Sequence, residues 1–109
     1  MEEYFRQEWI RSLFGLAVDA LRERLENSGR QAQFQLFERY DLCGADTPDR
    51  PTYAELAKAF ELPPTQVTNY LAAARREFRR IVLERLRELT GSDEEFRLEA
   101  RELLGIDPP

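Results

Sequence analysis

Histidine is absent from this sequence of 109 residues, and cysteine, methionine and tryptophan occur once each. Because Cys43 is alone, no disulfide forms within the chain, and an ordinary zinc site of cysteine and histidine is excluded. No apolar run approaches the roughly 20 residues that cross a membrane, and the N-terminal segment lacks the basic and apolar regions of a secretory signal. We therefore expect a cytoplasmic protein without a metal or another cofactor.

Features of an enzyme are equally scarce. The sequence has no nucleophile motif, no glycine-rich phosphate loop and no acidic cluster spaced for a metal. Paired acids such as Glu94 and Glu95 are explained by the helix dipole, which favours carboxylates in the first turn of a helix. We expect no catalytic residues and no enzymatic activity.

Helical periodicity runs through the whole chain, and no alternating pattern long enough for a strand is present. The content of 42% hydrophobic and 11% aromatic residues is sufficient for a core. We predict a single all-α, five-helix domain over 1–109, divided into an N-terminal helix (1–30), a central unit (31–90) and a C-terminal helix with a tail (91–109). The helices are expected at about 2–27, 31–41, 52–61, 64–90 and 92–105.

Apolar stripes on the outer helices predict how they are buried. The N-terminal stripe contains Tyr4 or Phe5, Trp9, Leu13, Leu16, Ala17, Ala20, Leu21 and Leu25, and we interpret its aromatic residues as core. Val82, Leu86 and Leu89 form another stripe, which we expect to be covered by the N-terminal helix and by the final helix through Phe96, Ala100, Leu103 and Leu104. The prediction is a compact monomer, with a homodimer as the alternative.

The segment Thr52 to Arg80, TYAELAKAFELPPTQVTNYLAAARREFRR, reads as two helices joined by a short turn. Thr52 and Glu55 match a capping box at the start of the first helix. Pro63 and Pro64 end that helix and begin the next, because proline suits the first helical position but not the interior. This pattern is typical of a helix-turn-helix, which makes DNA the first partner to test.

The faces of the second helix follow from a rotation of about 100° per residue. Val67, Leu71, Ala74 and Phe78 form the predicted core stripe, so the opposite face is free to read DNA. Polar side chains at its start are the candidates for contacting base edges: Thr65, Gln66, Thr68 and Asn69. The candidates for contacting phosphates are Thr52, Lys58, Arg75, Arg76, Arg79 and Arg80.

The stretch YAELAKAFELPPTQVTNYLAAARREFRR resembles region 4 of bacterial RNA polymerase sigma factors, and Gln31 to Leu42 resembles the helix that precedes this unit. The resemblance implies a helix-turn-helix that reads the −35 promoter element and docks on the flap of the polymerase β subunit. In the turn, where the family often has glycine, this chain has Glu61. The segment that melts the −10 element has no counterpart, so the chain is either a small protein or part of a longer sigma-like one.

The charge of the chain leaves an alternative open. The net charge is −5, which is unusual for a DNA-binding domain, although residues 65–89 carry six basic and three acidic side chains. The alternative is an interaction module of the same fold that has lost DNA binding and binds RNA polymerase or another sigma factor. The acidic balance favours this alternative, whereas the arginines of the reading helix favour DNA.

Overall fold

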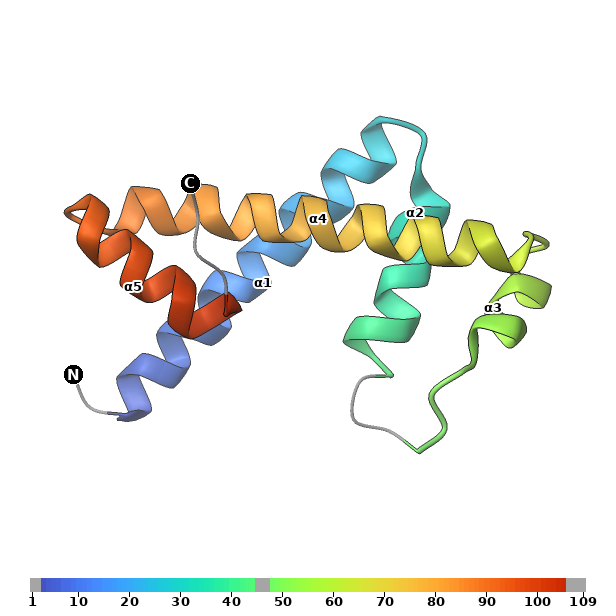
Figure 1. Ribbon diagram of the computed structural model, residues 1–109, viewed down its shortest axis with the longest axis horizontal. Coiled ribbons are helices and arrows are strands. Elements are labelled where there is room, and N and C mark those ends of the chain that lie inside the picture. Colours follow the sequence, from blue (N-terminus) through green and yellow to red (C-terminus); the bar gives the residue numbers. More distant parts are fainter. Residues whose placement is uncertain (1–2, 45–47, 106–109) are drawn as a thin grey trace. The chain divides into compact units, whose positions relative to one another are not determined.

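The computed structural model describes residues 3–44 and 48–105, which form five α-helices and no strand (Figure 1). The helices are α1 (Glu3–Asn27), α2 (Gln31–Phe37), α3 (Tyr53–Ala59), α4 (Pro64–Leu89) and α5 (Asp93–Leu104), and a π-helical turn, η1 (Glu38–Leu42), continues α2. The predicted all-α class is confirmed. None of the described helices is both long and apolar enough to cross a membrane.

Glycine ends two of these helices. Gly29 has a φ of +74°, and beyond it the Arg30 amide donates to the Leu25 carbonyl at 2.7 Å, closing α1 with a bond typical of a left-handed cap. Gly105, with a φ of +68°, ends α5 in the same conformation. Because glycine has no Cβ, it adopts these positive φ values without steric cost.

Two compact units divide the chain. In the described part, unit 1 contains residues 3–20 and 78–105, and unit 2 contains residues 21–44 and 48–77. Helices α1 and α4 each contribute to both units.

Unit 2 has its own apolar core. Helix α4 contributes Val67, Leu71 and Ala74, each 0% exposed, as its predicted stripe requires. The other core residues come from the end of α1, from α2 and from α3: Leu21, Leu25, Phe34, Leu36, Phe37, Leu56 and Ala57. Each large side chain that is fully buried contributes roughly 1.5 to 3 kcal/mol, so this core fixes which side of α4 remains at the surface.

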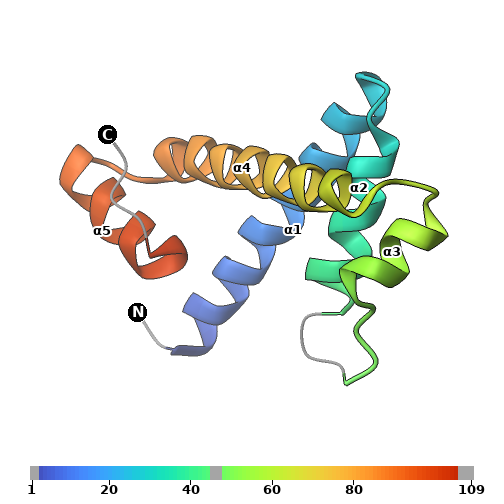
Figure 2. The same cartoon turned by 45° about the vertical axis from the view of Figure 1, so that its right-hand side comes forward.

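Unit 1 is built from the beginning of α1, the end of α4 and α5. Its buried side chains are Leu13, Ala17, Ile81, Val82, Leu86, Phe96 and Ala100. The Phe14 and Phe78 rings stack with centroids 5.9 Å apart. Arg6 of α1 pairs with Glu99 and Glu102 of α5, so the final helix packs in the same unit as α1, as its apolar face predicts (Figure 2).

Two predicted core positions in this unit are wrong. They are Leu16 and Leu89, which are 57% and 56% exposed. Of the alternatives Tyr4 and Phe5, Phe5 is 60% exposed, and the side chain of Tyr4 lies outside the described residues. Leu16 precedes the buried Ala17 by one residue, and the rotation of about 100° between them turns Leu16 away from the core. Leu89 continues the Val82 and Leu86 stripe but lies in the last turn of α4, where burial ends.

Candidate nucleic-acid interface

Hydrogen bonds fix the start of α3 and both ends of the turn that leads from α3 to α4. The capping box at the start of α3 is confirmed, with the Thr52 hydroxyl accepting from the Glu55 amide at 3.1 Å and the Glu55 carboxylate accepting from the Thr52 amide at 3.2 Å. After α3, the Leu62 amide donates to the Ala57 carbonyl at 2.9 Å. Pro64 then begins α4, as predicted. The Gln66 amide donates to the Pro63 carbonyl at 2.9 Å, so hydrogen bonds hold the turn at its α3 end and at its α4 end.

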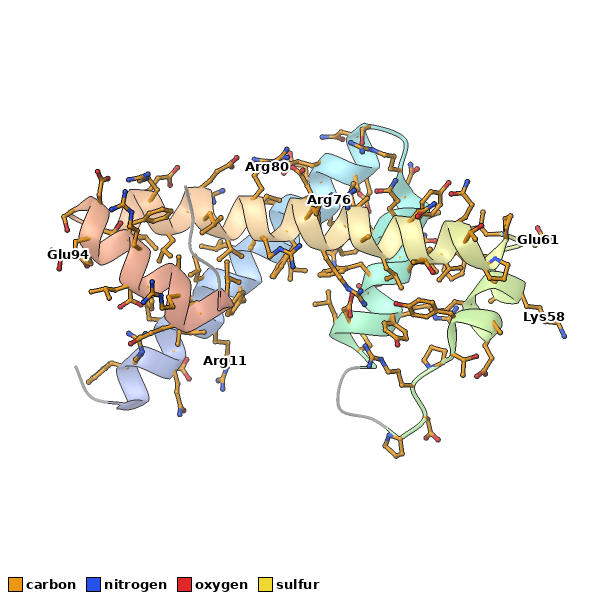
Figure 3. The ribbon with its side chains drawn as sticks, in the orientation of Figure 1. Arg11, Lys58, Glu61, Arg76, Arg80 and Glu94 are labelled. Carbon is orange, nitrogen blue, oxygen red and sulfur yellow. The ribbon has the colours of Figure 1, made fainter. Side chains whose placement is uncertain are left out.

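Glu61 is the only described residue other than glycine with a positive φ, at +56°. It occupies the turn between the end of α3 and the start of α4, and Lys58 of α3 lies nearby (Figure 3). An L-amino acid in the left-handed region brings its Cβ close to a carbonyl oxygen, at a cost of about 1–2 kcal/mol. The turn therefore needs the geometry that glycine provides most easily.

The predicted base-reading residues occupy the first two turns of α4. Thr65, Thr68 and Asn69 are exposed, and Gln66 is half-buried. The Thr68 hydroxyl donates to the Pro64 carbonyl at 3.4 Å, which turns its oxygen toward the helix backbone. A row of short polar side chains therefore faces solvent opposite Leu71 and Val67.

The predicted phosphate ligands fall into two groups. Lys58, Arg76 and Arg79 are exposed, and no ion pair involves them within residues 3–44 and 48–105 (Figure 3 labels Lys58 and Arg76). Thr52 uses its hydroxyl in the capping box, and Arg80 interacts with another residue of the chain. Arg79 and Arg80 belong to the unit 1 portion of α4.

Arg75 has a different role in this structure. Its guanidinium forms a two-pronged ion pair with Asp41 of η1, with nitrogen–oxygen distances of 2.8 and 2.9 Å. The pKa of Arg75 is raised above its ordinary value, mainly by the hydrogen bond to Asp41. A bidentate pair of this kind fixes both direction and distance, so Arg75 holds α4 against the π-helical turn. Because the pair occupies Nε and Nη2, Arg75 has fewer donors left for a phosphate than a free arginine has.

A cluster of aromatic and basic side chains surrounds Asp41. The Arg50 guanidinium lies 3.6 Å from the centre of the Tyr40 ring and donates to the Tyr40 carbonyl at 3.1 Å. The Tyr40 and Tyr53 rings meet edge to face at 5.0 Å. The cluster joins η1, the loop before α3, α3 itself and α4. Sequence reasoning missed it because Asp41 and Arg75 are 34 residues apart and no local pattern links them.

Other arginines of unit 2 are also paired. Arg24 pairs with Glu77 at 2.9 Å, and Arg22 pairs with Glu38 at 3.5 Å. The sequence of unit 2 contains eight basic and nine acidic residues, so this unit is nearly neutral overall. Within the described residues of unit 2, Lys58 and Arg76 are among the cations that no ion pair involves.

No group of three or more potential metal ligands occurs in the described part of the chain. Comparisons with protein-family models, with curated proteins and with solved structures give no significant match.

Proposed function

We propose that the chain is a DNA-binding transcription module that resembles sigma factor region 4 and reads −35-like promoter DNA with the beginning of α4. The observation that carries the proposal is the exposed row of Thr65, Thr68 and Asn69 on a helix whose other side is fully buried at Val67 and Leu71. A helix anchored in this way presents the same polar face each time it meets a groove.

The chemistry of this face suits a major groove. The Asn69 amide has both a donor and an acceptor, which match the N7 and N6 positions of adenine, and Gln66 offers the same pair of groups. The methyl group of Thr65 can contact a thymine methyl. Lys58 and Arg76 carry positive charge that is free to contact phosphates on either side of the reading residues.

NMR titration of the full chain with a −35-like duplex at low salt tests the proposal. We expect chemical-shift changes for residues at the beginning of α4 and in the preceding turn. Changes confined to other helices, or no changes, would leave the interaction-module alternative, which the net charge of −5 favours. In that case, contact with RNA polymerase or another sigma factor would be the function to test.

Three variants separate the roles of these residues within the interface. Asn69→Ala should reduce discrimination between sequences, by roughly 1–3 kcal/mol for a good base contact, while Arg76→Ala should weaken all sequences alike. Arg75→Ala is the matched control for Arg76→Ala, because Arg75 is engaged with Asp41. It should lower the melting temperature, whereas Arg76→Ala should leave it unchanged. Equal loss of discrimination for all three variants would show that the roles are wrongly assigned.

A further inference from the structure

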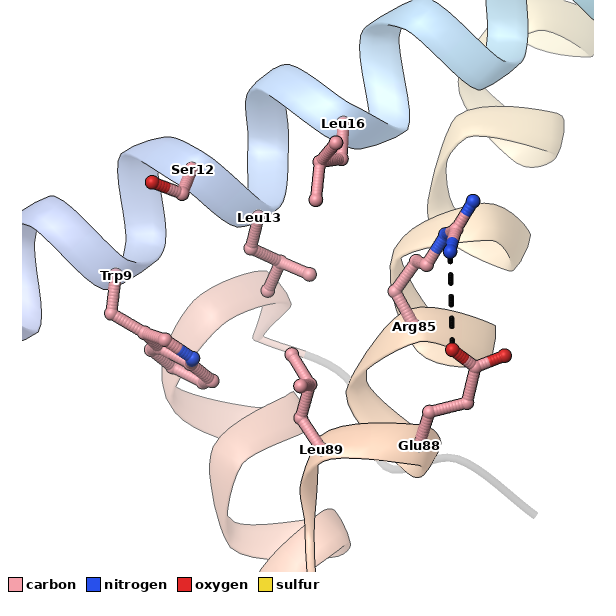
Figure 4. A pocket seen from close by; sticks show the side chains of 7 residues that line it. All are labelled: Trp9, Ser12, Leu13, Leu16, Arg85, Glu88 and Leu89. Atoms are coloured by element: carbon pink, nitrogen blue, oxygen red, sulfur yellow. Dashed lines mark ion pairs between the residues drawn. The ribbon is translucent and has the colours of Figure 1, made fainter.

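Unit 1 contains an apolar groove that the proposed function does not use (Figure 4). Its volume is about 260 Å³, and it is lined by Trp9, Ser12, Leu13 and Leu16 of α1 and by Arg85, Glu88 and Leu89 of α4. A second hollow of about 180 Å³ shares Trp9 and Leu89 with it and is bounded further by Arg6, Thr90, Glu95 and Glu99. The two hollows therefore form one continuous surface across unit 1.

The groove exposes leucine side chains on both of its sides. Leu13 is 2% exposed and forms the floor, whereas Leu16 and Leu89 are 57% and 56% exposed and stand on opposite helices (Figure 4). An apolar cavity of about 150 Å³ accommodates a benzene ring, so this volume admits a large apolar side chain. Leucines that face each other across an open groove, beside an indole, are typical of a protein-interaction site.

The ionisable side chains that line the two hollows are mostly acidic. The carboxylates are Glu88, Glu95 and Glu99. Both arginines already have carboxylate partners. A guanidinium nitrogen of Arg85 lies 3.9 Å from a carboxylate oxygen of Glu88, and one of Arg6 lies 3.0 Å from a carboxylate oxygen of Glu99 and also pairs with Glu102. The sequence of unit 1 contains eight basic and twelve acidic residues. A ligand of this surface must therefore be compatible with an excess of negative charge.

We infer that this groove binds an amphipathic helix of a protein partner, one that inserts a large apolar side chain between Leu16 and Leu89 and carries lysine or arginine beside it. Charge complementarity selects this occupant. A second copy would bring the same acidic surface, and an anionic lipid surface would be repelled by it. The inference concerns residues of unit 1 only, so it does not depend on DNA binding by unit 2.

Trp9 provides the assay, because it is the only tryptophan of the chain and lines the groove. The probes are two designed helical peptides with the same leucine and phenylalanine stripe, one with lysine and arginine at its other positions and one with glutamate. Added to the full chain, the basic peptide should shift Trp9 emission to shorter wavelength at saturation, and its binding should weaken as salt is added. The acidic peptide should bind at least about tenfold more weakly.

Leu89→Glu and Leu98→Glu are a matched pair of variants, since both leucines are 56% exposed but only Leu89 lines the groove. Circular dichroism should show both folded. Leu89→Glu should lower the affinity for the basic peptide by about tenfold or more, which is the loss expected when one leucine side chain is no longer buried. Leu98→Glu should lower this affinity by less than about twofold.

Three results would overturn the inference. The first is unchanged Trp9 emission with both peptides, and the second is equal binding of the basic and the acidic peptide. The third is concentration-dependent dimerisation of the unmodified chain that Leu89→Glu abolishes, which would identify a second copy as the occupant. Sedimentation equilibrium of both proteins distinguishes this last case from binding of the partner helix.

Discussion

Glu61→Gly should stabilise the protein. Glu61 has a φ of +56°, and its neighbours fix the turn through the bond from the Leu62 amide to the Ala57 carbonyl at 2.9 Å. The left-handed conformation costs a residue with a Cβ about 1–2 kcal/mol, whereas glycine adopts it freely. Glycine also loses more conformational entropy on folding, which offsets about 0.5–1 kcal/mol of this gain. The expected net stabilisation is about 0.5–1 kcal/mol.

Thermal and urea unfolding, followed by circular dichroism, measure this difference. For a chain of this size, a stabilisation of this order raises the melting temperature by about 2–8 °C. Glu61→Gln is the matched control, because it removes the charge but keeps the Cβ. The Glu61 carboxylate is repelled by the C-terminal end of the α3 dipole and attracted by the N-terminal end of the α4 dipole, so Glu61→Gln should have nearly the same stability as the unmodified protein.

The difference in stability between Glu61→Gly and Glu61→Gln measures the strain at this turn. If Glu61→Gly is no more stable than Glu61→Gln, the strain at this turn contributes nothing measurable and the reasoning is refuted. In DNA titrations at low salt, both variants remove one negative charge from the turn and should bind DNA slightly more tightly. A gain restricted to the glycine variant would indicate that turn geometry, rather than charge, controls the position of α4.

Two further predictions concern packing in the two units, and urea unfolding tests both. Gly44→Ala should destabilise the protein by about 1–3 kcal/mol, because a Cβ there would lie 2.7 Å from the Arg39 carbonyl oxygen. Gly15→Ala on α1, where nothing lies within 4 Å, should instead be stabilising by up to about 1 kcal/mol, and equal effects would contradict the steric argument. Phe96→Ala should cost about 3–5 kcal/mol, whereas Leu98→Ala should change stability by less than about 0.5 kcal/mol. A small effect of Phe96→Ala would show that α5 contributes little to unit 1.

Local patterns predicted the helices well. The capping box at Thr52 and the proline at position 64 each act through neighbouring backbone groups, so their effects are visible in a short stretch of sequence. The predicted span of α4, about 64–90, is also confirmed, because the helix runs from Pro64 to Leu89. Periodicity likewise identified the buried side of α4, from which the exposed polar row follows.

Long-range contacts could not be predicted in the same way. The pair between Asp41 and Arg75 depends on where η1 meets α4, and nothing within a few residues of either one indicates it. The π-helical turn itself replaces the last part of a predicted regular helix. The exposure of Leu16 and Leu89 also depends on how much of each stripe another helix covers, which periodicity does not specify.

Ion pairs within the protein, such as that of Arg75 with Asp41, lower the number of cations available to DNA phosphates. The salt dependence of DNA binding by the full chain measures that number. Five cations were predicted to contact phosphates: Lys58, Arg75, Arg76, Arg79 and Arg80. Three of them, Lys58, Arg76 and Arg79, have no ion pair within the described residues.

Each neutralised phosphate contributes about −0.9 to the slope of log affinity against log salt, so three contacts give about −2.7 and five give about −4.5. We expect a slope near the smaller value, because Asp41 already neutralises Arg75. Arg76→Ala should reduce its magnitude by about 0.9, and Arg75→Ala should leave it unchanged. A slope near −4.5 that falls in both variants would mean that DNA displaces Asp41 from Arg75, and the assignment of Arg75 to the internal cluster would then fail in the complex.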